Sequence, residues 1–119
     1  MKNVNAQCLS GADTGNVTGI QLNTNQWMTA SFHAYFGDAT ATGTLKVQIS
    51  NDPCPYGNIT PDFTATNWVD LPNATAAVTA GSSAVISVAN CAYRWMRLVY
   101  TRTSGGSTTV TGNVNAIYF

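Results

Sequence analysis

The sequence has few charged residues. Asp, Lys and Arg together make up 8% of its 119 residues, Glu is absent, and the formal net charge is zero, whereas typical soluble domains carry about 25% charged residues. A chain without net charge has no electrostatic attraction to nucleic acid or to an anionic membrane, so we expect neither as a partner. Its copies also repel each other little, which favours a protein that works in an assembly.

Long apolar runs are missing as well. No run reaches the roughly 18 apolar residues of a transmembrane helix, and none is expected. Met1 is followed by Lys2 and a polar run without the apolar core of a signal peptide, so we expect synthesis in the cytoplasm. The three cysteines, Cys8, Cys54 and Cys91, form no CxxC pair and no zinc pattern, which predicts reduced thiols and no metal site.

Catalytic patterns are also lacking. His33 is the single histidine, and a triad would require it beside a cysteine or serine with a carboxylate behind it. No GxSxG, Walker or dinucleotide pattern occurs. The aspartates stand mostly in turn contexts, where hydrogen bonds to the local backbone explain them; a calcium site in the loops at Asp38, Asp52 or Asp62 is the open alternative. We therefore predict that the chain is not an enzyme and holds no cofactor or metal.

Alternating strands are what the sequence does contain. In the stretch 91–102, CAYRWMRLVYTR, the residues Met96, Leu98 and Tyr100 would face a core, and Trp95 and Arg97 the opposite side. Similar alternation predicts strands at 17–22, 26–36, 42–50, 68–71, 76–79, 84–88 and 108–118. Because Ser104-Gly105-Gly106-Ser107 separates the two longest C-terminal runs, we expect these runs to form a hairpin.

About eight short strands without a convincing helix predict an all-β protein: a single antiparallel β-sandwich or jelly-roll-like domain. Residues 1–15 are poor in apolar side chains and are expected to form an N-terminal arm, which either frays or orders on a neighbouring subunit. The sandwich domain would span 16–119. Residues 51–67, with three prolines in or beside them, are expected to form a long loop.

Aromatic and arginine side chains outside the predicted core are the candidate site. Residues of these types anchor protein interfaces. The alternatives are that the 51–67 loop covers them, or that they form a platform on which sugars stack. The candidate interface residues are Trp27, His33, Tyr35, Tyr56, Trp95 and Arg97.

Three segments resemble small all-β structural proteins of tailed bacteriophages, in particular head decoration (cement) proteins: GTLKVQISNDP (43–53), TNWVDLP (66–72) and residues 82–119. Motifs of the NWVD and YRWMRL type also occur in discoidin-like sugar-binding sandwiches. The resemblance implies a virion protein on a β-sandwich, made in the cytoplasm of a bacterial host, that binds other subunits and has no active site.

The resulting functional hypothesis is a capsid decoration protein. It would contact major capsid protein subunits and stabilise the shell, as a homo-oligomer for which a trimer at local threefold axes would be natural. The alternative hypothesis is a carbohydrate- or receptor-binding module of a tail or head fibre, which would expose Trp27 or Trp95 in a shallow groove.

Overall fold

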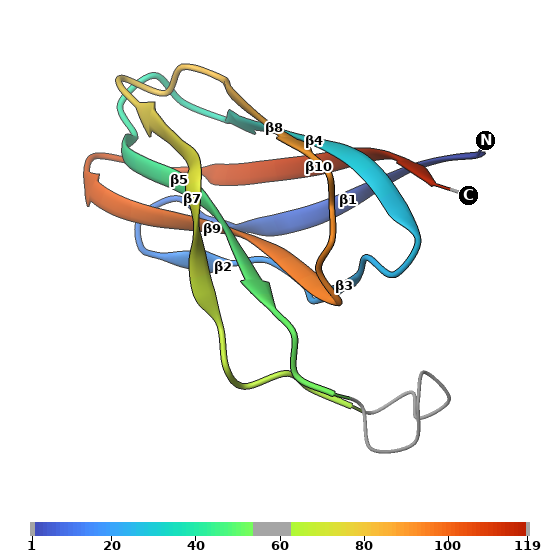
Figure 1. The fold of residues 1–119 in the computed structure, drawn as a ribbon. Helices are drawn as coiled ribbons and strands as arrows, with labels where there is room; N and C mark the ends of the chain where they lie inside the picture. Colours follow the sequence, from blue (N-terminus) through green and yellow to red (C-terminus); the bar gives the residue numbers. More distant parts are fainter. Residues whose placement is uncertain (1, 54–62, 119) are drawn as a thin grey trace.

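The computed structural model describes residues 2–53 and 63–118, and this part of the chain is all-β, with two antiparallel sheets packed face to face (Figure 1). The predicted β-sandwich is confirmed. No helix among the described residues is long and apolar enough to cross a membrane. The described strands are β1 (Lys2–Ala12), β2 (Val17–Thr18), β3 (Leu22–Asn23), β4 (Trp27–Phe36), β5 (Thr42–Ser50), β7 (Val69–Val78), β8 (Ala84–Ala89), β9 (Trp95–Ser104) and β10 (Thr109–Tyr118).

The chain passes repeatedly from one sheet to the other. Sheet A has the strand order β1-β10-β4-β8, and sheet B has the order β2-β9-β5-β7, with β3 also paired to β9. Strands that follow each other in sequence, such as β4 and β5 or β8 and β9, therefore lie in opposite layers. Each passage between the layers needs a connection that arches over the core.

The predicted C-terminal hairpin is wrong. β9 pairs with β5 in sheet B, whereas β10 pairs with β1 and β4 in sheet A. Gly105 and Gly106 have φ angles of 71° and 91°, a conformation that favours glycine, and a side chain on Gly105 would collide with the Thr40 carbonyl. These glycines let the chain arch between the sheets, so that Tyr100 and Val110 both face the shared core.

The N-terminal segment also differs from the prediction. Residues 2–12 form β1, an edge strand of sheet A that pairs with β10 almost along its whole length. Cys8 and Leu9, near a bulge in this pairing, are buried in the core. The segment has few apolar residues and so gives a weak alternation signal, and its conformation is decided by the backbone hydrogen bonds that β10 offers.

β7 replaces the two short strands predicted at 68–71 and 76–79. It runs through Pro72 because β7 is an edge strand, where the missing N–H of proline costs no hydrogen bond of the ladder. Its register with β5 shifts across this region, and Asn73 has a φ angle of 63°. By contrast, β5 coincides with the predicted strand at 42–50.

The predicted loop at 51–67 can be followed at its two ends. Residues 51–53 and 63–67 belong to no strand. Residues 54–62, which include Cys54, Tyr56 and Asp62, lie outside the described residues.

The core lies between the sheets and consists of the alternating residues predicted from the sequence. Met96 and Tyr100 in β9 are fully buried, as are Leu45 in β5 and Val110 in β10; Phe32 in β4 is 1% exposed. Neither the Tyr100 hydroxyl nor Asp13 Oδ2 has a hydrogen-bond partner among the described residues. Burial raises the pKa of Tyr100.

Asp38 joins two connections at one end of the sandwich. Its carboxylate accepts hydrogen bonds from the Thr40 N–H at 2.7 Å and from the Ser107 N–H at 2.6 Å. These donors lower the pKa of Asp38, because they stabilise the ionised form. The turn role predicted for Asp38 is confirmed, and the bonds tie the β4–β5 connection to the β9–β10 arch.

Candidate functional site

The outer side of sheet A carries no charged residue, and we refer to it as the uncharged face. Register pairs place Asn113, His33 and Val85 in one row across β10, β4 and β8, and Asn115, Ser31 and Ser87 in the next. The outward residues of the four strands are Asn3, Asn5, Gln7, Ser10, Ala12, Thr109, Thr111, Asn113, Asn115, Ile117, Thr29, Ser31, His33, Tyr35, Val85, Ser87 and Ala89.

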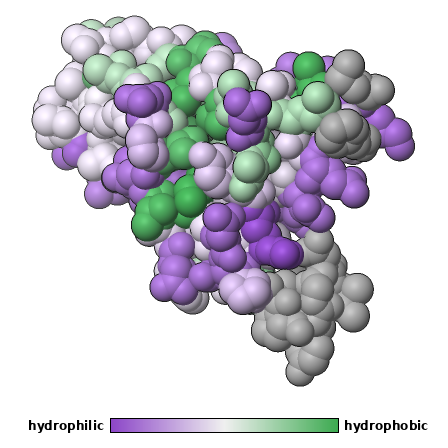
Figure 2. All heavy atoms as spheres, viewed as in Figure 1, coloured by the Kyte–Doolittle hydropathy of each residue, from purple (hydrophilic) through white to green (hydrophobic). Residues whose placement is uncertain are grey.

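Charges lie elsewhere on the molecule. On the side seen in Figure 2, the most hydrophilic residues gather in the lower half, and the upper-left end, where the β7–β8 turn lies in Figure 1, is pale. The described charged residues are Lys46, Asp70 and Arg97 on the outer side of sheet B, Asp13, Asp38 and Arg102 at one end of the sandwich, Asp52 and Arg94 towards the other end, and Lys2 at the start of β1.

Two of the sequence-predicted site residues, His33 and Tyr35, lie on the uncharged face. Both are exposed, and their ring centroids are 5.9 Å apart. His33 is on the opposite side of sheet A from Cys8 and Cys91, which are buried inside the sandwich. The sheet therefore separates His33 from these two described cysteines, and burial raises the pKa of the Cys8 thiol to about 11, which disfavours a reactive thiolate.

Trp27 does not share the face of His33. The pairing of β4 with β10 shifts at this end: Thr29 is opposite Ile117, but Trp27 is opposite Tyr118, so Met28 is an extra residue. Such a bulge reverses the side to which the following residues point. Trp27 is half-buried and packs against the main core.

Trp95 points to the outer side of sheet B, as predicted, but it is covered. Its exposure is 7%, and Phe63 stacks on it with a centroid distance of 5.4 Å. Its indole Nε1 donates a hydrogen bond to the Asp52 carbonyl at 3.0 Å. For Trp95, the structure therefore matches the alternative in which part of the 51–67 segment folds over the outward aromatic residues.

The covering segment is held from both sides. Gln21 accepts a hydrogen bond from the Ala65 N–H at 2.8 Å, and the Asp52 carboxylate accepts bonds from the N–H groups of Thr66 and Asn67. The bonds from Asn67 and Thr66 lower the pKa of Asp52. Residues 63–68 thus form an ordered cover over this end of sheet B.

Arg97 belongs to a polar strip beside this cover. Its guanidinium lies 4.3 Å from the centre of the Trp68 ring, and its Nε donates to Gln48 at 2.8 Å. Gln48 in turn donates to Asp70, which also pairs with Lys46 at 3.2 Å. The sequence predicted Arg97 as a candidate interface residue but not Trp68, because the contact of Trp68 with Arg97 depends on the path of residues 63–68.

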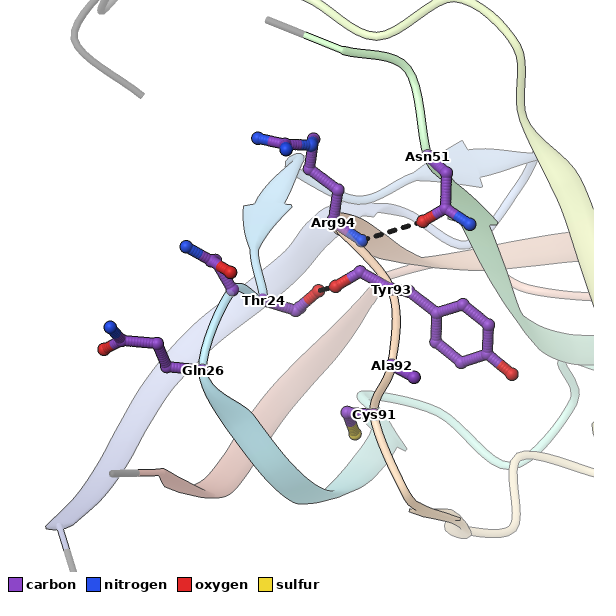
Figure 3. Close-up of a pocket in the computed structure, with 8 residues that line it drawn as sticks. Thr24, Gln26, Asn51, Cys91, Ala92, Tyr93 and Arg94 are labelled. Atoms are coloured by element: carbon purple, nitrogen blue, oxygen red, sulfur yellow. Dashed lines mark hydrogen bonds between the residues drawn. The ribbon is translucent and has the colours of Figure 1, made fainter. Parts of the chain in front are cut away.

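A polar hollow of about 490 Å³ lies at the end of the sandwich where β4 begins (Figure 3). Across it, the Thr24 hydroxyl donates to the Tyr93 carbonyl at 2.7 Å, and the Arg94 N–H donates to Asn51 Oδ1 at 3.0 Å. The strained turn residue Gln26 has a φ angle of 74°. The polar atoms here hold two connections together, and among the described residues no group of three His, Cys or Asp side chains could hold a metal ion.

Comparison with known proteins gives a likeness of fold. No protein-family model and no curated protein sequence matches the chain. The SPBc2 prophage-derived protein YomS matches with a TM-score of 0.55 and 9% identity, over 98% of this chain and 95% of that one. This chain shares its fold with a prophage-derived protein.

Two other solved structures share the fold. The K3 cleaved adhesin domain of Lys-gingipain from Porphyromonas gingivalis matches with a TM-score of 0.50 and 14% identity, over 92% of this chain and 72% of that one. A chain of deformed wing virus matches with a TM-score of 0.50 and 10% identity; 99% of this chain aligns to 44% of the viral one. At these identities the comparisons establish the β-sandwich alone.

Proposed function

We propose that this chain is a structural protein of a tailed-phage particle, acting as a capsid decoration protein that contacts shell subunits through the uncharged face. The observation that carries the proposal is the absence of charged residues from the outward positions of all four strands of sheet A. A solvent-facing sheet of a soluble monomer normally carries charges of both signs. The centres of protein interfaces, by contrast, are depleted of charge.

The composition of this face suits a broad, shallow contact. Its Asn, Ser and Thr side chains can donate and accept hydrogen bonds without the cost of burying an ion. Tyr35, which is 43% exposed, and the neighbouring His33 offer ring surface of the kind that anchors interfaces. Many copies on one shell would make modest single contacts sufficient. The phage-like segments in the sequence and the fold shared with a prophage-derived protein support the virion as the location.

Co-sedimentation with empty shells of the parent phage tests the proposal. Asn115→Lys places a charge in the middle of the uncharged face, and we expect it to weaken shell binding at least tenfold because the charge must be desolvated. Ala77→Lys is the matched control: it adds the same charge to an exposed position of β7 in sheet B, opposite the uncharged Thr44. If both variants bind like the unmodified chain, the uncharged face is not the contact. If the unmodified chain ignores shells, the decoration role is lost.

The second candidate is a carbohydrate- or receptor-binding module, favoured by the polar strip on sheet B. There, the Arg97 guanidinium lies against the Trp68 indole, and hydrogen bonds link it through the Gln48 amide to the Asp70 carboxylate. The groove with an exposed Trp95 that this hypothesis predicted is not present, because Phe63 covers Trp95. Glycan binding that disappears in Trp68→Ala and persists in Asn115→Lys would favour this candidate.

A further inference from the structure

The edge of sheet A at β8 is the least protected sheet edge in the described structure. Native proteins block edge strands with prolines, charges, bulges, short length or a covering segment, because an open edge can pair with another chain. β7 has Pro72 and an irregular register, and β2 and β3 contain two residues each. β1 begins with Lys2, and its second half is covered where the Ile20 N–H bonds to the Cys8 carbonyl at 3.0 Å.

β8 contains no proline, no charged residue and no bulge. Its residues Ala84–Ala89 pair with β4 without a register shift, and no other described strand pairs with it. The sequence from 71 to 93 contains no charged residue. Val85 is 58% exposed although it is a large apolar residue in a strand.

Two hollows adjoin β8. One hollow of about 300 Å³ lies on the uncharged face, and another of about 200 Å³ lies between β8 and β7. Ser87, Val88 and Ala89 line both hollows. An additional strand at this edge would lie beside residues 71–74 of β7, which line the second hollow.

The pattern of β8 matches itself in antiparallel pairing. Residues opposite each other in an antiparallel pair share a face. With Ser87 opposite Ser87 of a second copy, Val85 lies opposite Ala89 on the outer side and Ile86 opposite Val88 on the inner side. Apolar residues then meet apolar residues on both faces, and the twofold axis brings no like charges together.

We propose that β8 pairs with β8 of a second copy across a twofold axis at Ser87, which joins two sheets A into one continuous sheet. This gives a dimer in place of the trimer suggested by shell symmetry. A pair of six-residue strands buries less than a standard interface of about 1,600 Å², so we expect a dissociation constant on the order of 10 μM. The pairing itself does not rest on the decoration role; its consequence, a doubled uncharged face with greater avidity for a shell, does.

Sedimentation velocity of the full chain over a range of concentrations tests the pairing. We expect a monomer–dimer equilibrium that Ser87→Lys shifts at least tenfold towards monomer, since two ammonium groups would meet at the axis. Asn5→Lys is the matched control, because it adds the same charge to the same face at the opposite edge, and it should dimerise like the unmodified chain. Unchanged circular dichroism and melting temperature would show that both variants fold.

Cross-linking tests the register. In a Cys54→Ser background, where the two remaining thiols Cys8 and Cys91 are buried, Ser87→Cys should form a disulfide-linked dimer under mild oxidation, because directly opposite Cβ atoms lie about 4.5–5.5 Å apart and a small shift of the strands brings them to the roughly 3.5–4.5 Å of a disulfide. Asn5→Cys should not. A chain that stays monomeric at hundreds of micromolar, or a dimer that Ser87→Lys leaves intact, would overturn the proposal. These measurements contain no shells, so their failure is distinct from a failure of the decoration role.

Discussion

Replacing Trp95 by alanine tests whether residues 63–68 cover sheet B in solution. The indole is 7% exposed, stacks on Phe63 and donates a hydrogen bond to the Asp52 carbonyl. Ala65 and Trp68 complete this small apolar cluster outside the main core. Removing the ring therefore leaves a cavity under residues 63–68 and removes the contacts that hold these residues against β9.

The expected loss of stability follows from the burial. Truncating a buried Phe or Trp to Ala costs about 3–5 kcal/mol, and the lost indole hydrogen bond contributes about 1 kcal/mol of such a total. Because the cluster lies near the surface and the Asp52 carbonyl can be rehydrated, we expect a value near the lower end, about 3–4 kcal/mol. With a denaturant slope of about 1.5 kcal/mol per molar urea, the unfolding midpoint should fall by about 2 M.

Urea unfolding followed by circular dichroism measures this change. Trp95→Phe keeps a stacking ring without the N–H donor and should lose about 1–2 kcal/mol. Tyr35→Ala, on the exposed face of β4, should change stability by less than about 0.5 kcal/mol. A loss below about 1 kcal/mol for Trp95→Ala, with an unchanged slope, would show that the cover is open in solution. Trp95 would then be exposed in solution and would again be a candidate interface residue.

Three further predictions concern single polar or strained groups. Hydrogen bonds hold the pKa of Asp38 below its unfolded value of about 3.9, so the stability that this carboxylate contributes is present at neutral pH and is lost as the pH falls through the folded pKa. Asp38→Asn should therefore be less stable than the unmodified chain at neutral pH and lose less stability on acidification. Parallel pH profiles of the two melting temperatures would contradict this. Tyr100→Phe should cost less than about 1 kcal/mol in urea unfolding, because no described residue bonds the hydroxyl, whereas a loss above about 2 kcal/mol would reveal a bonded one. Ala80 has a φ angle of 52°, so Ala80→Gly should relieve strain and raise stability by about 0.5–1 kcal/mol, and a lower melting temperature would refute that reasoning.

The strands themselves could be predicted because each has one face in a single core. Alternation over 42–50 and 92–102 places Leu45, Val47, Leu98 and Tyr100 inside, and all four are buried. The alternation pattern of a strand does not indicate which other strand it pairs with. Glycine-rich turn residues such as Gly105 suit both a hairpin and an arch between the sheets, so the sequence could not distinguish the two connections. Only the structure shows that β9 pairs with β5.

The candidate site was predictable only in part for the same reason. His33 and Tyr35 could be placed outside the core from the alternation of one strand. The uncharged face could not be predicted, because it exists only once β1, β10, β4 and β8 are known to be neighbours. Trp27 was misplaced by one extra residue in the ladder, a shift that a local pattern does not record.

The pairing of β1 with β10 has a consequence for synthesis. β10 lies between β1 and β4, so until residues 109–118 have left the ribosome β1 has no partner strand in sheet A and β4 can pair only with β8. At roughly 5–20 residues per second, β1 waits for several seconds without its partner. The described chain must therefore complete its fold after β10 has been translated, and a nascent chain lacking β10 would expose both β1 and the inner edge of β4 to solvent or to a chaperone.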